Sequence, residues 1–200
     1  MKEKNKKNIA TLAKVAVMGA VAAVVMLLEF PLPFIAPPFY QLDLSEYVVL
    51  LGGFALGPAA AVGIEAVKIV CNLLLNGTIT FGVGEFANFV IGTSFVLTAC
   101  IIYKYKKTKK GALIAMTVGT LVMMIVGCVV NAYVLIPSFA AAGGYTVDSI
   151  VAMATDINKN IDSLWKMMLL AVAPFNLIKG VVISALTFLS YKKLAPILKK

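Results

Sequence analysis

The stretch LSEYVVLLGGFALGPAAAVGIEAVKIVCNLLL (residues 44–75) is an almost continuous apolar block. A helix needs about 20 apolar residues to cross the hydrocarbon layer of a membrane, so this block is too long for one such helix and short for two. The pair Gly57-Pro58 lies inside it. Proline breaks a helix interior but is favoured at the first helical position, so this pair can end one helix and start the next. The block therefore predicts two short helices, over residues 44–56 and 58–75.

Four more apolar runs lie on either side of this block, and each is long enough to span a membrane. The chain of 200 residues is 61% hydrophobic and 14% charged, whereas ordinary soluble domains are about 45–50% apolar and about 25% charged. A soluble fold of this size cannot hide so many apolar side chains. The sequence predicts an all-α integral membrane protein with six transmembrane helices in a compact bundle, a single membrane domain over residues 1–200. The predicted helices cover residues 9–30, 44–56, 58–75, 84–103, 112–136 and 165–191.

The lysines indicate how these helices are oriented. The net charge is +9, all the basic residues are lysines, and they cluster at residues 2–7, 104–110 and 191–200. Lysine clusters beside apolar spans mark cytoplasmic ends. An even number of helices must then separate the N-terminus from residues 104–110. The predicted helices at 9–30 and 84–103 supply two, so residues 44–75 must supply two more or none. None would leave this apolar block outside the membrane, so two helices are expected there. Both termini are thus expected in the cytoplasm.

Three loops are then expected on the outer side, over residues 31–43, 76–83 and 137–164. The last is the longest, and its part from residue 147 to residue 164 is predicted to form a short amphipathic helix. A cleaved secretory signal is the alternative for the N-terminal run. The length of that run, and the absence of a small-x-small site before Glu29, favour a retained helix.

Several kinds of chemistry have no candidate residues. The chain has no histidine, which argues against a zinc site and against a histidine proton relay. Its cysteines, Cys71, Cys100 and Cys128, lie in apolar runs without metal-binding spacing. The sequence has no GxxxxGK[ST] loop for ATP and no Ser-His pair for hydrolysis. We therefore expect no enzyme, no metal and no cofactor, and a solute-binding protein of this kind would take its energy from a partner.

The last predicted helix carries the deepest charged residue. Asn176 and Lys179 share one helical face, directly after Pro174. Ionisable groups inside a membrane helix usually face a cavity or a partner. Lys179 therefore needs an acceptor, either a ligand or an internal carboxylate such as Glu85 or Glu65.

Further polar residues lie inside the other predicted helices. Asn131 lies in the outer half of the fifth, and Glu85 and Asn88 open the fourth. Amides both donate and accept hydrogen bonds, which suits a neutral solute better than an ion, although the amides could equally join helices to one another. Glu65 and Lys68, three residues apart on the third helix, are equally well explained by an ion pair near the membrane interface.

The first helix carries small residues at a spacing of four, which lets another helix approach closely. They form Ala16-x-x-x-Ala20 and Gly19-x-x-x-Ala23. The pattern indicates a docking face for a partner helix, with internal packing as the alternative.

Three runs carry a family resemblance: FPLPFIAPPFYQLDLSE (residues 30–46), GGFALGPAAAVGIEAVK (52–68) and GTITFGVGEFANFVIG (77–92). Together with APFNLIKG (173–180), they resemble the riboflavin-specific S components of energy-coupling factor (ECF) transporters. The resemblance implies a bacterial, multi-pass plasma-membrane subunit that captures the vitamin outside with high affinity. It also implies partners: a transmembrane T subunit, docked on the small-residue face of the first helix, and two cytoplasmic ATPase subunits. An S component for thiamine, biotin, folate or pantothenate is the alternative.

The resemblance also implies a set of binding residues. By matching position, Asn131, Asn176 and Lys179 are expected to contact riboflavin, with Glu85 and Asn88 as further contacts. A neutral flavin fits the absence of arginine. A phosphorylated flavin would prefer more cations, although Lys179 is one.

The proline-rich loop at residues 29–46 is expected to cover the site. Its prolines stiffen it, so less entropy is lost when it closes. Phe34, Phe39, Tyr40 and Leu42 are predicted to cover a flat ring, and anchoring at the membrane interface is the alternative for these aromatic side chains.

The acidic end of the same loop has a structural interpretation. Asp43 or Ser45 is predicted to cap the following helix, and Glu46 lies where the positive end of the helix dipole favours an acid.

Overall fold

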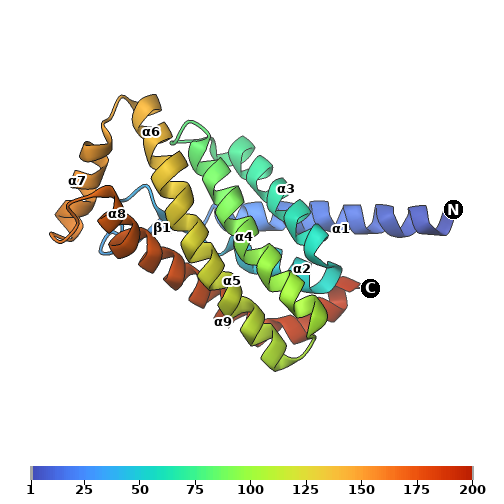
Figure 1. Cartoon of the computed structure of the whole chain (residues 1–200). Helices are drawn as coiled ribbons and strands as arrows, with labels where there is room; N and C mark the ends of the chain where they lie inside the picture. Colours follow the sequence, from blue (N-terminus) through green and yellow to red (C-terminus); the bar gives the residue numbers. More distant parts are fainter. Residues whose placement is uncertain (1, 200) are drawn as a thin grey trace.

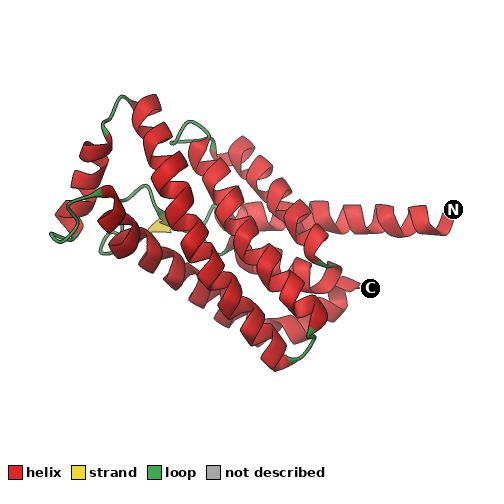
Figure 2. Cartoon of the chain, viewed as in Figure 1, coloured by secondary structure: helices red, strands yellow, loops and turns green. Residues whose placement is uncertain are grey.

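The computed structural model describes residues 2–199, except for the side chains of residues 2–7 and 199. The side chains of the first lysine cluster, and Lys200, therefore lie outside the described part. The described chain is almost entirely helical (Figures 1 and 2). Its elements are α1 Lys2–Met26, β1 Phe30–Pro31, β2 Gln41–Leu42, α2 Ser45–Leu56, α3 Pro58–Asn76, α4 Val83–Tyr105, α5 Lys109–Val130, the π-helix η1 Asn131–Leu135, α6 Ile136–Gly143, α7 Val147–Ile157, α8 Leu164–Met167, the π-helix η2 Met168–Val172 and α9 Ala173–Lys199.

Five helical stretches are long and apolar enough to cross a membrane. They are Asn8–Met26, Pro58–Asn76, Val83–Tyr105, Lys109–Gly143 and Leu164–Leu198. α2 is apolar too, but it has only 12 residues and most of them are buried. Because α1, α3, α4 and α9 all contact it, α2 is a core helix shielded by longer neighbours.

The break between α2 and α3 depends on one glycine. Gly57 has φ 105° and ψ 171°, a backbone conformation that side chains with a Cβ rarely adopt. Its N–H donates to the carbonyl of Gly53 and closes α2, and Pro58 takes the first position of α3. The structure thus has helices at Ser45–Leu56 and Pro58–Asn76, where the sequence predicts 44–56 and 58–75.

The first predicted helix ends earlier than expected, at Met26 instead of residue 30. A residue before proline disfavours the helical conformation, and Phe30 precedes Pro31. Instead, Phe30–Pro31 pairs antiparallel with Gln41–Leu42, and this short ribbon closes the base of the 29–46 loop.

The last two predicted helices are longer than expected. α5, η1 and α6 run on to Gly143 rather than ending at residue 136, and α9 runs to Lys199 rather than residue 191. Their continuation through Pro137 and Pro196 is what the sequence pattern missed. The predicted outer loop 137–164 therefore starts within α6 and ends where α8 begins. Between these helices lies α7, which ends at Ile157, whereas the predicted short helix extends to residue 164.

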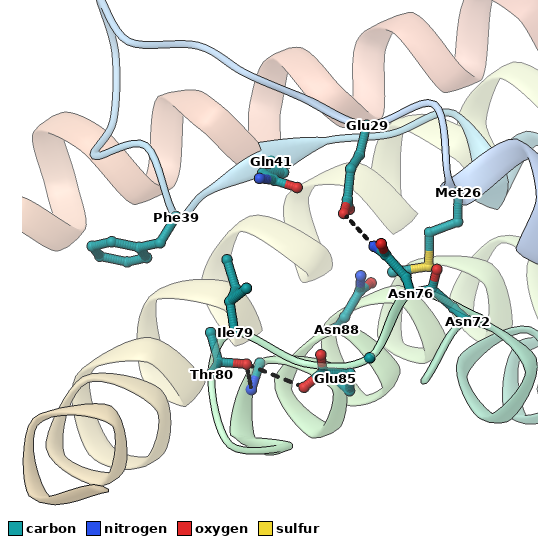
Figure 3. Close-up of a pocket in the computed structure, with 12 residues that line it drawn as sticks. Met26, Glu29, Phe39, Gln41, Asn72, Asn76, Ile79, Thr80, Glu85 and Asn88 are labelled. Carbon is teal, nitrogen blue, oxygen red and sulfur yellow. Dashed lines mark hydrogen bonds between the residues drawn. The ribbon is translucent and has the colours of Figure 1, made fainter. Parts of the chain in front are cut away.

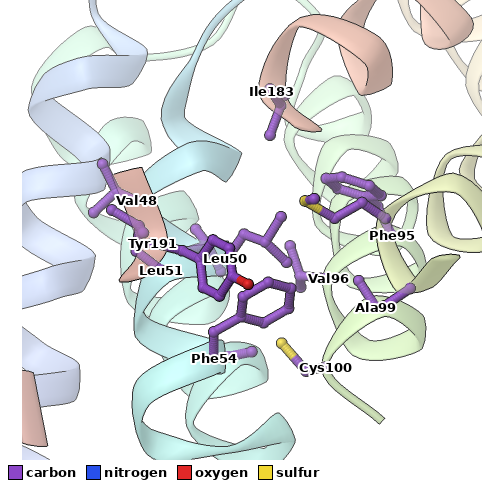
Figure 4. Packing of buried hydrophobic residues seen from close by; sticks show 14 of the residues in the cluster. Val48, Leu50, Leu51, Phe54, Phe95, Val96, Ala99, Cys100, Ile183 and Tyr191 are labelled. Atoms are coloured by element: carbon purple, nitrogen blue, oxygen red, sulfur yellow. The ribbon is translucent and has the colours of Figure 1, made fainter. Parts of the chain in front are cut away.

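Close helix packing fills the bundle. One buried apolar cluster joins α1, α2, α3, α4, α5 and α9, and Figure 4 shows Phe54, Phe95 and Tyr191 within it. A Cβ at Gly53 would lie 2.3 Å from Cys100 Sγ, so glycine lets α2 and α4 approach. Large apolar side chains such as Leu74, 80% exposed, cover the outside, as a lipid-facing surface requires.

The ends of the bundle differ in content. Figure 1 places the start of α1, the end of α9 and the turn after α4 toward one end. The ribbon, α6 and α7 lie toward the other end. A second buried apolar cluster belongs to that end and joins the 29–46 loop to α6, α7 and η2.

Candidate functional site

Two adjoining cavities lie between the 29–46 loop, the start of α4, η1 and α9. Their volumes are about 270 and 110 Å³, and Phe39, Gln41, Thr80, Gly84 and Asn88 line both. We therefore treat them as two halves of one site. The larger, polar half is further lined by Met26, Glu29, Asn72, Asn76, Gly77, Ile79 and Glu85. The smaller, aromatic half is further lined by Tyr40, Ala87, Ile91, Asn131, Leu135, Phe175, Asn176 and Lys179.

Rings from the loop and from α9 form much of the aromatic half. The Tyr40 ring centroid lies 4.6 Å from that of Phe39 and 5.8 Å from that of Phe175. Tyr40 is nearly buried, and its hydroxyl donates to Asn131 Oδ1 over 2.7 Å. The loop is therefore fastened to η1 by a buried hydrogen bond as well as by ring packing.

The two predicted amides keep hydrogen-bonding capacity for the cavity. Asn131 Nδ2 donates to the carbonyl of Gly127 (2.7 Å), and Asn176 Nδ2 donates to that of Val172 (2.9 Å). Among the described residues, Asn176 Oδ1 has no hydrogen-bond donor. Each amide is thus held by a bond one turn back along its own helix, and Asn131 also by the Tyr40 hydroxyl. The remaining hydrogen-bonding capacity of each amide is open to a ligand.

Two wide turns place these amides. η1 begins at Asn131 and η2 ends four residues before Asn176, and each π-helix is followed two residues later by a proline, Pro137 or Pro174. A proline ring clashes with the carbonyl four residues before it, which here lies inside the π-turn, and the wider turn relieves the clash. Both helices are therefore distorted beside the cavity while remaining continuous.

Lys179 borders the aromatic half and is only 7% exposed. Its Nζ lies 2.8 Å from Asp43 Oδ2 and 3.0 Å from Glu46 Oε1. The expectation that an internal partner would be Glu85 or Glu65 is wrong, because the end of the 29–46 loop and the start of α2 fold against α9. Burial raises the pKa of Asp43, but the Lys179 ammonium more than offsets this and holds that pKa well below its usual range.

Asp43 also binds the first residue of α2, but the predicted cap is wrong, because the N-cap position is Leu44 and has no side-chain capping bond. Asp43 Oδ1 accepts the backbone N–H of Ser45 over 2.8 Å and also the Ser45 hydroxyl. The other oxygen, Oδ2, accepts from Lys179, so this one carboxylate links the start of α2 to α9.

The polar half is rich in amides and carboxylates (Figure 3). Asn76 Nδ2 donates to Glu29 Oε1 over 3.1 Å, and Thr78 and Thr80 donate to Glu85 Oε2 over 2.9 and 3.1 Å. Burial, followed by the nearby charge of Asp43, raises the pKa of Glu29 above its ordinary value. Among the described residues, no cation lines this half.

The predicted ring-covering residues of the loop divide into two groups. Phe39 and Tyr40 line the cavity, whereas Leu42 is buried and lines neither half. Phe34 is 73% exposed and also lines neither half, which fits the alternative of an interfacial anchor.

The small residues of α1 divide between a buried face and an exposed face. Gly19 and Ala23 are both buried, and a Cβ at Gly19 would lie 2.5 Å from the Val67 side chain, so Gly19 packs against α3. Ala16 and Ala20 are exposed and remain open to a partner.

The ion pair between Glu65 and Lys68 is present, with Nζ and Oε1 2.7 Å apart. Both side chains are fully buried within the helix bundle. The location of the pair near the membrane interface stays a prediction.

Other residues of the site had weak sequence signals or none. Asn72 and Asn76 lie four apart on α3, a spacing that places both on one face and could have marked them. Gln41, Thr80 and Phe175 carry no comparable pattern.

Comparisons with known proteins agree with this geometry. The family model described as ECF transporter, substrate-specific component matches residues 10–191. A solved structure described as "Structure and mechanism of the S component of a bacterial ECF transporter" is 35% identical and superposes with a TM-score of 0.72, covering 98% of this chain and 99% of that one.

Curated relatives are similar over almost their whole length. Riboflavin transporter RibU of Staphylococcus aureus (strain TCH60) is 34% identical over 189 residues, which are 94% of this chain and 92% of that protein. Riboflavin transporter FmnP of Bacillus subtilis (strain 168) is 29% identical over 186 residues, 92% of each chain.

Proposed function

Because this chain belongs to the substrate-specific (S) components of ECF transporters, we propose that it captures riboflavin outside the cell and delivers it inward with a partner ATPase module. The chain is then a transport subunit rather than an enzyme, and the flavin is its cargo rather than a cofactor. The similarity to curated riboflavin transporters supports this choice of vitamin.

The observation that carries the proposal is the division of the site into an aromatic and a polar half. Riboflavin has a flat ring system with hydrogen-bonding edges, joined to a flexible chain of neutral hydroxyls. The aromatic half offers Phe39, Tyr40 and Phe175 to the ring, and Asn176 and Lys179 to its polar edge. A mostly apolar pocket with a few well-placed polar groups is what a ligand of this shape requires.

The polar half suits the hydroxyl chain. Its amide and carboxylate side chains, among them Asn72, Asn76, Glu29 and Glu85, accept or donate hydrogen bonds to alcohols. A phosphate at the end of this chain would meet two carboxylates and, among the described residues, no cation. Since Lys179 already faces Asp43 and Glu46, the site favours neutral riboflavin over its phosphorylated form.

The membrane topology follows from the same assignment. We count the shorter α2 as a sixth crossing beside the five long apolar helices. An even number of crossings leaves both termini on one side of the membrane. The lysines of the turn after α4, Lys106 and Lys107, are exposed, and this turn lies toward the same end as the termini (Figure 1). We assign this end to the cytoplasm of a bacterial cell, by the positive-inside rule.

The partners we propose are a transmembrane T subunit and two cytoplasmic ATPase subunits. The exposed face of α1 around Ala16 and Ala20 supports a docking site for a T-subunit helix, since small residues permit close helix approach.

The test is a fluorescence-quenching titration of detergent-purified protein with riboflavin, alongside thiamine, biotin, folate and pantothenate. We expect only riboflavin to bind tightly. Asn176→Ala should weaken binding by about tenfold, whereas the matched amide variant Asn160→Ala, on an exposed outer turn, should not change it. Tight binding of another vitamin in place of riboflavin would refute the proposal.

A further inference from the structure

Five buried ionisable side chains form a continuous line from the ligand cavity into the bundle. Asp43 and Glu46 contact Lys179 over 2.8 and 3.0 Å, Glu46 contacts Lys68 over 3.2 Å, and Lys68 contacts Glu65 over 2.7 Å. The signs of the charges alternate along the line, and of its five members only Lys179 lines the cavity. We call this the charge line.

Glu46 connects the two lysines of the charge line. Its Oε1 is within 3.2 Å of Lys68 Nζ and 3.0 Å of Lys179 Nζ, so two ammonium groups share one carboxylate oxygen. An ammonium has three N–H donors. Lys179 donates one of them to Asp43, and Glu46 is its ion-pair partner at 3.0 Å, so Lys179 keeps at least one donor for a ligand.

The charge line is sealed from solvent. Except for Lys179, each of its side chains is at most 1% exposed. Gly92 of α4 packs directly against it, since a Cβ there would lie 2.4 Å from Glu65 Oε1 and 3.1 Å from Glu46 Oε1. With so little screening, a change in the charge of one member alters the interaction of its neighbours strongly.

From this geometry we propose that Lys68 and Glu65 are positioning residues for the ligand site, although neither touches the cavity. Lys68 neutralises part of the charge on the Glu46 carboxylate, so Glu46 attracts the Lys179 ammonium less strongly. Lys179 can then donate a hydrogen bond to the bound flavin. Glu65 acts in the opposite direction, because it competes with Glu46 for Lys68. This inference rests on the proposed riboflavin site.

The two residues therefore have opposite effects on affinity. In Lys68→Met, Lys179 is the one remaining lysine of the described chain in contact with Glu46. We expect the dissociation constant for riboflavin to rise about tenfold. Glu65→Gln frees Lys68 for Glu46, and we expect binding to tighten by about threefold. A purely structural role predicts that both substitutions lower the unfolding temperature and move affinity in the same direction or leave it unchanged.

The decisive experiment is a double-mutant cycle with Lys179→Met, read by riboflavin fluorescence quenching. If Lys68 acts through Lys179, Lys68→Met in the Lys179→Met background changes the dissociation constant by less than about twofold. An undiminished tenfold loss in that background overturns the inference. The matched control is Lys166→Met, which removes an exposed lysine paired with Asp162 and should leave affinity unchanged.

Two further outcomes are separable. If wild-type protein does not bind riboflavin, the proposed function fails, and this inference fails with it. If wild type binds but Lys68→Met binds equally well, only this inference fails. Should Lys68→Met not yield folded protein, Glu65→Gln alone carries the test: tighter binding that disappears in the Lys179→Met background supports the charge line, and weaker or unchanged binding overturns it.

Discussion

Gly127→Ala should weaken riboflavin binding without adding or removing a functional side chain. The structure places a Cβ at this position 2.7 Å from Asn176 Nδ2 and 3.2 Å from its Cγ. Ordinary van der Waals contact begins near 3.4 Å. The Asn176 amide must therefore move by about 0.7 Å, away from the bond to Val172 that holds it.

The expected magnitude follows from one displaced hydrogen bond. Losing an amide bond to the ligand costs about 1 kcal/mol, with a similar penalty where a buried polar group of the ligand is left unpaired, so affinity should fall by about five- to thirtyfold. Stability should change little. Alanine in a helix interior gains about 1 kcal/mol over glycine, which offsets the cost of about 0.5–1.5 kcal/mol for an off-rotamer Asn176.

The assay is a pair of measurements on the same purified protein: riboflavin quenching for the dissociation constant and thermal unfolding for stability. Gly63→Ala is the matched control, because its Cβ would meet only the flexible Val15 side chain at 3.1 Å and Gly63 does not line the site. If Gly127→Ala binds riboflavin as tightly as wild type, the placement of Asn176 at the ligand is refuted.

Three more predictions follow from particular groups. Replacing Glu29 and Glu85 together by glutamine should narrow the affinity gap between riboflavin and its 5′-phosphate by about tenfold, because the repulsion of a phosphate in the polar half is removed; an unchanged ratio in parallel titrations would exclude that placement of the hydroxyl chain. The pKa of Asp43 is lowered on folding, so its contribution to stability is present above about pH 4 and is lost as the pH falls through its folded-state pKa. The difference in unfolding temperature between wild type and Asp43→Asn should therefore shrink on acidification, and a difference that grows would contradict the Lys179 contact. Gly57→Ala should destabilise the protein by about 1–3 kcal/mol, because φ 105° is strained for any residue with a Cβ; an unchanged unfolding temperature would show that α2 and α3 can be joined in another way.

The sequence alone contained most of the membrane architecture. Apolar runs, and the Gly57-Pro58 pair, locate α2, α3 and α4 within two residues at each end, because a chain buried in lipid must satisfy its backbone hydrogen bonds within helices. Errors occurred where a local rule competed with packing. α6 continues past Pro137 because a π-turn absorbs the proline, and neither periodicity nor composition encodes that turn.

The sequence predicted which polar residues of the candidate site need partners, but not which partners they contact. That Lys179 needs an acceptor, and that Asn131 and Asn176 are poorly suited to hydrocarbon, follows from the energy of polar groups in a membrane. Which acceptor Lys179 finds does not, since Asp43 is 136 positions away in sequence and several carboxylates were equally plausible. Only the packing of the 29–46 loop and α2 against α9 brings that carboxylate within 2.8 Å of the ammonium. The physical reason lies in two different energies. The cost of burying a charge depends on the residue type, which the sequence gives. The attraction to an opposite charge that offsets this cost depends on the distance between the two groups, which only the folded chain sets.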